Sequence, residues 1–112
     1  MSLPLPALFV SHGAPDLLLT EHAALAALRD IASRLPHPAA IIAVSAHWMA
    51  EPIGVTAAVS PATIHDFHAF PDVLYAVPYP APGHPELAGE IQMRLPARGL
   101  EPHSVCERGL AP

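Results

Sequence analysis

The sequence has no lysine, one cysteine and little charge of either sign. Charged residues make up 13% of the chain, and five arginines against ten acidic residues give a formal net charge of -5. A surface with this balance does not neutralise phosphate groups, so neither nucleic acid nor an anionic membrane surface is an expected partner. Because Cys106 has no second cysteine to pair with, the fold needs no oxidising compartment, and we expect a cytoplasmic protein.

Long apolar runs are also lacking. The longest covers residues 39–44 and is interrupted by Ser45 and His47, far short of the roughly 20 apolar residues that cross a bilayer. No basic segment typical of a signal peptide follows Met1. With 52% hydrophobic residues in 112 positions, the chain has enough apolar surface for one core. We therefore expect no membrane partner and a single domain over residues 1–112.

Proline and histidine, in contrast, are abundant. Fifteen prolines without a regular period divide the chain into short elements, because proline fixes φ and lacks a backbone donor. Eight histidines outnumber the five arginines. Neutral imidazole is the commonest metal ligand in proteins, so this composition raises the question of a metal site.

The first half of the chain has the pattern of a strand, a helix and a second strand. Residues 6–10 form a short apolar run that is stopped by glycine and proline. A helix is predicted over residues 21–35 with Thr20 as its cap, and residues 40–44 are apolar throughout, as in a strand covered on both faces. This order predicts an α/β fold with a mainly parallel central sheet flanked by helices.

The second half contains shorter elements around a long loop. A third strand is predicted at residues 53–57 and a last one at residues 101–106. Residues 61–85 combine six prolines with aromatic side chains, which indicates a long structured loop of the kind that is often functional. A helix is predicted from Pro85 to about Arg94, with Gly99 as its stop.

Two histidines follow the first two predicted strands. His12 comes two residues after residue 10, and His47 comes three residues after residue 44. In a parallel sheet both positions fall at the carboxyl edge, where open α/β folds build their sites. The two imidazoles can then bind one metal ion. The alternative is that each ring is bonded to backbone carbonyls at the end of its strand.

Four segments carry a resemblance to a known family. They are residues 9–15 (Phe-Val-Ser-His-Gly-Ala-Pro), 44–48 (Val-Ser-Ala-His-Trp), 63–67 (Thr-Ile-His-Asp-Phe) and 79–83 (Tyr-Pro-Ala-Pro-Gly). In this order they resemble the first part of the class III extradiol ring-cleavage dioxygenases, in the branch typified by DOPA 4,5-dioxygenase. The resemblance implies a partial LigB-like α/β domain that corresponds to the N-terminal half of the family fold.

The resemblance also implies a chemistry. The family's metal ligands in the first two segments correspond to His12 and His47, and the metal is Fe(II), with zinc bound in some members. Two imidazoles and a third protein ligand leave coordination positions open, so that a small aromatic diol and O2 bind side by side. The implied reaction is extradiol cleavage of a catechol-type ring.

Family members are more than twice as long, and their later half supplies the third ligand and the acid/base histidine. Activity is therefore expected only where the rest of the site is supplied. The alternative function is a catalytically inactive relative that acts as a metal-binding or oligomerising module. A partial fold of this kind would leave an apolar sheet edge and uncovered helix faces, and we therefore expect a homo-oligomer.

The remaining candidate residues have two interpretations each. His65 and Asp66 either contact substrate or orient a ligand from the second shell, or they form a polar turn. Trp48 and Phe67 either line an aromatic pocket or belong to the core. His22 and His37 are predicted to be solvated, His84 to begin a helix and His103 to lie in a strand or loop.

Overall fold

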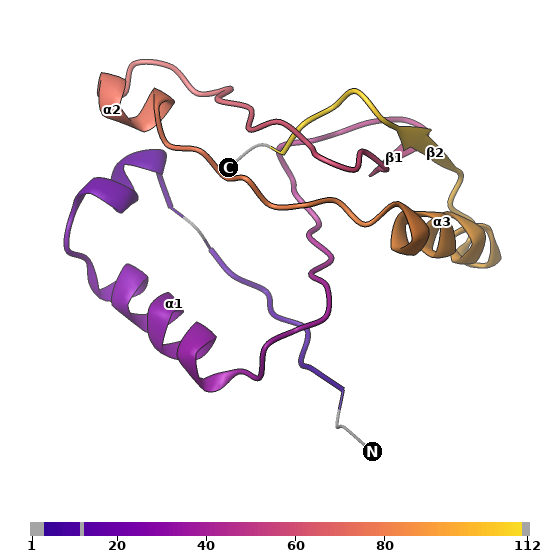
Figure 1. Cartoon of the computed structure of the whole chain (residues 1–112), viewed down its shortest axis with the longest axis horizontal. Coiled ribbons are helices and arrows are strands. Elements are labelled where there is room, and N and C mark those ends of the chain that lie inside the picture. Colours follow the sequence, from indigo (N-terminus) through magenta and orange to yellow (C-terminus); the bar gives the residue numbers. More distant parts are fainter. Residues whose placement is uncertain (1–3, 12, 111–112) are drawn as a thin grey trace. The chain divides into compact units, whose positions relative to one another are not determined.

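A computed structural model of the chain describes residues 4–11 and 13–110 (Figure 1). The chain divides into two compact units. The first unit comprises Met1–Ile42 and Phe67–Ala76, and the second comprises Ala43–Asp66 and Val77–Pro112. Each unit is described by itself below, and the expected single domain over residues 1–112 stays a prediction.

The second unit is built on a parallel pair of strands. Strand β1 (Ile53–Thr56) pairs with β2 (Pro102–Val105), in a register that runs from Ile53 opposite Pro102 to Thr56 opposite Val105. The ladder continues beyond β1, where the Ala57 N–H donates to the Val105 carbonyl over 2.9 Å. Helix α3 (Pro85–Arg94) packs against both strands (Figure 1). The α/β fold with a parallel sheet and helices is thus confirmed, as are the strands predicted at residues 53–57 and 101–106.

Helix α3 begins and ends where the sequence indicates. Pro85 occupies the first turn, and His84 caps the helix because its Nδ1 accepts the Leu87 N–H over 3.1 Å. The chain continues into a 3-10 helix, η2 (Pro96–Arg98), which ends at Gly99 with a φ of 74°. Ala88 is 4% exposed and forms part of the core of this unit. His84 as a helix-start residue and Gly99 as a stop are confirmed.

The first unit contains the other helices: η1 (Pro15–Leu19), α1 (Ala23–Arg34) and the short α2 (Asp72–Tyr75). The predicted Thr20 cap of α1 is wrong. His22 caps this helix instead, with its Nδ1 accepting the Ala24 N–H over 3.1 Å, because Thr20 already ends η1. In the described part of the chain, no helix has the length and apolar character needed to cross a membrane.

The strands predicted at residues 6–10 and 40–44 are absent from the described structure. Both segments are extended but unpaired, and their side chains are exposed, with Phe9 at 105% and Val44 at 95%. The physical reason is that an all-apolar strand gains its stability from hydrogen-bonded neighbours and from layers on both faces. Neither segment has such a neighbour among the described residues.

Candidate functional site

His47 lies on a turn of the second unit, between Ser45 and Trp48. The His47 N–H donates to Ser45 Oγ over 3.2 Å, and the Trp48 N–H donates to the Ser45 carbonyl over 3.4 Å. The His47 residue is exposed. The other predicted ligand, His12, lies outside the described residues. The structure thus positions one of the two predicted imidazoles on the surface of a turn.

The described residues contain no group of three His, Cys, Asp or Glu side chains that is arranged to hold a metal ion. His47 has the right donor chemistry, because a neutral imidazole nitrogen suits iron and zinc. A complete coordination set needs further donors beside it. The described part of the chain therefore fits a contribution to a metal site rather than a whole one.

His65 joins two segments of the second unit. Its Nε2–H donates to the Val77 carbonyl over 2.8 Å, and two residues away the Tyr79 N–H donates to Thr63 Oγ1 over 2.8 Å. His65 is half-buried, whereas the neighbouring Asp66 is exposed. These two bonds hold together the two ends of the loop over residues 66–76. The ring of His65 is fixed in orientation by this contact.

Phe67 forms an aromatic cluster in the first unit. Its ring lies 4.9 Å from that of Tyr75 and 5.5 Å from that of Phe70, centroid to centroid, and the second pair meets edge to face. The Tyr75 hydroxyl also donates to the Phe67 carbonyl over 3.2 Å. Within the same loop, Leu74 is 2% exposed. The cluster supports the interpretation of Phe67 as a packing residue.

The motif segment that contains His65 is joined to residues 107–110 beyond the carboxyl ends of β1 and β2. The Leu110 N–H donates to the Ala62 carbonyl and the Ile64 N–H donates to the Leu110 carbonyl, each over 2.7 Å. Gly109, between them, allows this approach because a Cβ there would lie 2.8 Å from the Ala62 carbonyl carbon. The segment that contains His65 is therefore fixed against residues 107–110.

Another motif segment, residues 79–83, is anchored at the same end of the sheet. The Gly83 N–H donates to the Val59 carbonyl over 2.9 Å, shortly after β1. A Cβ on Gly83 would overlap the Ala58 carbonyl oxygen, so the close approach needs glycine. Segments 63–66, 79–83 and 107–110 thus form one connected structure.

Trp48, for which the sequence allows either an aromatic pocket or the core, packs against β1, and its contact with Arg108 is one that the sequence does not predict. Its indole fills the space left by Gly54 of β1, where a Cβ would lie 2.8 Å from Trp48 Cη2. The guanidinium carbon of Arg108 lies 5.0 Å from the centre of the Trp48 ring, within the range of a cation–π contact. The one signal in the sequence was Gly54 itself, since glycine inside a strand often marks a close approach.

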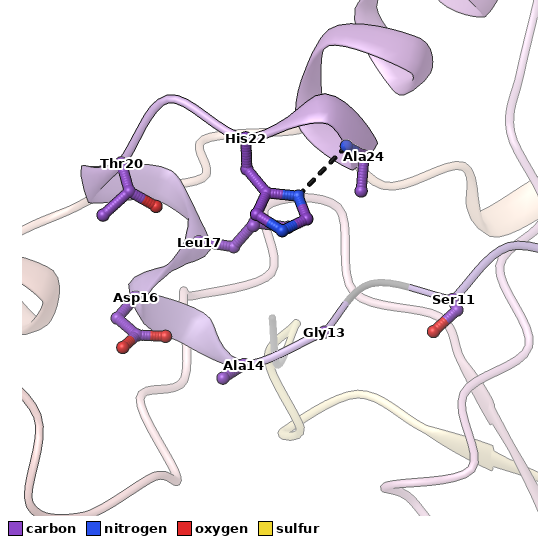
Figure 2. Close-up of a pocket in the computed structure, with 8 residues that line it drawn as sticks. All are labelled: Ser11, Gly13, Ala14, Asp16, Leu17, Thr20, His22 and Ala24. Atoms are coloured by element: carbon purple, nitrogen blue, oxygen red, sulfur yellow. Dashed lines mark hydrogen bonds between the residues drawn. The ribbon is translucent and has the colours of Figure 1, made fainter.

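A pocket of about 420 Å³ lies in the first unit, along the segment between Ser11 and Ala24 (Figure 2). Ser11 and Gly13, which flank His12, line it together with Asp16 and Thr20. His22 also borders it, with its Nδ1 bonded to the Ala24 N–H (Figure 2). The pocket is partly open to solvent, and apolar atoms make up most of its lining.

Comparison with known proteins places these features in a family context. The family model described as the catalytic LigB subunit of aromatic ring-opening dioxygenase matches residues 7–110. Similar curated proteins include a 4,5-DOPA dioxygenase extradiol of Escherichia coli (strain K12), which is 47% identical over 87 residues, or 78% of this chain. The proteins of the same name from Mirabilis jalapa and Beta vulgaris are 33% identical over 91% and 38% identical over 83% of this chain.

These matches cover only part of each relative. The chain spans 32% of the bacterial protein, 39% of the Mirabilis jalapa protein and 36% of the Beta vulgaris protein. The similarity therefore covers most of this chain and about a third of the length of these relatives.

Proposed function

The chain belongs to the LigB family of aromatic ring-opening dioxygenases, and from this premise we propose that it contributes to a metal-dependent site for extradiol cleavage of a catechol-type ring with O2. The observation that carries the proposal is that parts of two motif segments, residues 63–66 and 79–83, are joined to each other and to residues 107–110 beyond the carboxyl ends of β1 and β2. This is the edge at which open α/β folds place their sites. A cytoplasmic location stays a prediction.

His12 and His47 are the proposed protein ligands, and Fe(II) or Zn(II) is the proposed metal. A bound metal of this kind would lower the pKa of a phenolic oxygen and hold the diol beside O2. His47 suits the role because its residue is exposed on a turn whose backbone is bonded to Ser45. The proposed substrates are a small aromatic diol and O2.

His65 and Asp66 are proposed to act beside the ligands. The Nε2–H of His65 is committed to the Val77 carbonyl, so the ring is held in one orientation. A histidine whose ring is held in this way can help to position a substrate group or a neighbouring ligand. The exposed Asp66 is the proposed contact of this pair with the substrate.

A second candidate function is a catalytically inactive metal-binding or oligomerising module. The exposure of large apolar side chains favours it, with Phe9 at 105%, Ile41 at 75% and Val44 at 95%. Surfaces of this kind mark association sites. In that case the same histidines bind metal, but the chain turns over no substrate.

Anaerobic reconstitution with Fe(II), followed by addition of DOPA or catechol and then O2, separates the two functions. A yellow ring-opened product, formed by the wild-type chain and lost in His47→Ala, supports the dioxygenase. Metal uptake without product supports the module when the rest of the site has been supplied. His37→Ala is the matched control, since His37 is an exposed histidine bonded to the Pro38 carbonyl outside the motif segments. Equal metal content in wild-type and His47→Ala chains would contradict both functions.

A further inference from the structure

Trp48 connects the turn that carries His47 to the sheet of the second unit. It follows His47 directly, is half-buried and is the chain's single tryptophan. The indole packs where Gly54 leaves room on β1, and the Arg108 guanidinium lies over its ring at 5.0 Å. Gly54 and Arg108 come from parts of the chain that are far apart in sequence, and both meet at this one side chain.

Both neighbours of the indole belong to a fixed framework. Gly54 lies in β1 opposite His103 of β2. Arg108 lies two residues before Leu110, whose N–H donates to the Ala62 carbonyl and whose carbonyl accepts the Ile64 N–H, each over 2.7 Å. By comparison, the two hydrogen bonds inside the His47 turn are longer, at 3.2 and 3.4 Å. The indole therefore adds a side-chain anchor to the backbone bonds of the turn.

The residue types suit this anchoring role. A guanidinium is planar and stacks on aromatic faces, whereas a lysine ammonium is a compact point charge. Glycine is needed in β1 because a side chain at position 54 would overlap the indole. Gly54 has no side chain and the Arg108 guanidinium has no lone pair to give to a metal ion, so neither residue supplies a side-chain ligand.

We infer that Trp48, held by Gly54 and Arg108, is a positioning residue that fixes the His47 imidazole for metal binding. The inference rests on the proposed function, in which His47 is a ligand. Loss of a group that hydrogen-bonds a metal ligand and orients it typically weakens metal affinity by roughly 10–100-fold, and we expect a loss of the same order when the indole loses its own anchor. Removal of the Arg108 guanidinium should thus weaken metal binding although no ligand is lost.

The single tryptophan makes the test direct. Co(II) quenches indole emission at short range, so a Co(II) titration of the full 112-residue chain reports occupancy beside Trp48. The wild-type chain should show saturable quenching, and Zn(II) should reverse it by competition. Arg108→Met should show an apparent dissociation constant about 10–100-fold higher. Its metal-free emission should also shift to longer wavelength, because the indole loses its cover.

Arg98→Met is the matched control, because Arg98 is an exposed arginine of η2 and the charge change is the same. It should titrate like the wild type. Arg108→Lys keeps the charge without the planar group and should give an intermediate dissociation constant. If Arg108→Met alters the far-ultraviolet circular dichroism spectrum, the dissociation constant of Arg108→Lys decides the test instead.

His47→Ala separates failure of the inference from failure of its premise. Loss of saturable quenching in His47→Ala together with wild-type affinity in both Arg108 variants would overturn the positioning role and leave the ligand role standing. Wild-type affinity in His47→Ala would overturn the ligand role and the inference with it. Weaker binding in the Arg108 variants alone, with the Arg98 control unchanged, would support the inference.

Discussion

The described histidines differ in the atoms that they bond. His22 and His84 accept backbone N–H groups at the starts of α1 and α3, so their imidazoles serve as helix caps. His65 donates to a carbonyl and joins the ends of a loop. The abundance of imidazole in this chain therefore has several structural causes. The proposal for metal binding rests on His12 and His47 alone, through their place in the motif segments.

A pair of glycine-to-alanine substitutions should change stability in opposite directions. In Gly109→Ala the new Cβ meets Ala62 and lies 3.1 Å from Ile64 Cγ1, against a backbone held by two hydrogen bonds. We expect a loss of about 1–3 kcal/mol in the free energy of unfolding. Gly89, in α3, has open space around it, so Gly89→Ala should gain about 0.5–1 kcal/mol.

Urea unfolding followed by circular dichroism measures both changes, and each variant is the control of the other because the added group is the same methyl. A Gly109→Ala chain as stable as the wild type would contradict the close approach of residues 109 and 62.

For single residues, the sequence predicted roles that depend on near neighbours in the chain better than roles that depend on residues far away in the chain. His84 was predicted at a helix start because its role depends on neighbours up to three positions away. The contact between Trp48 and Arg108 was not predicted, because it depends on how β1 and β2 pair. The binding of one metal ion by His12 and His47 together stays a prediction, since His12 lies outside the described residues.

At the scale of elements, the start of α3 provides a test of the histidine cap. In His84→Ala the Leu87 N–H loses its acceptor, and we expect the free energy of unfolding to fall by about 1 kcal/mol. His84→Asn restores a side-chain acceptor at the same position and should recover most of this loss. Urea unfolding of the three chains gives the comparison. Equal losses in the alanine and asparagine variants would show that the cap contributes nothing.

Helices were predicted more accurately than strands, for a physical reason. The bounds of α1 and α3 follow from periodicity and end signals within each segment, and both lie close to their predicted ranges. A strand depends on partners elsewhere in the chain. Residues 53–56 find one in residues 102–105, whereas the more apolar residues 6–10 and 40–44 have none among the described residues.

At the scale of the whole molecule, the expected homo-oligomer stays a prediction that the exposed apolar side chains support. Val44 is 95% exposed and lies in an apolar segment with Ile41 and Ile42. If this segment mediates association, Val44→Asp should shift light scattering from a dimer or larger species towards the monomer. Met93→Asp is the control, since Met93 is 76% exposed and belongs to a different element, α3. A monomeric wild-type chain would contradict the prediction.

The parallel pairing of β1 with β2 also sets an order of events during synthesis. Parallel strands need a long crossover connection, and here α3 lies within it. On the ribosome, β1 emerges with its hydrogen-bonding edge open and keeps it open until residue 105 has left the exit tunnel. The strand pair therefore forms only after the residues up to 105 have emerged, and the contact between Trp48 and Arg108 forms only after residue 108 has followed.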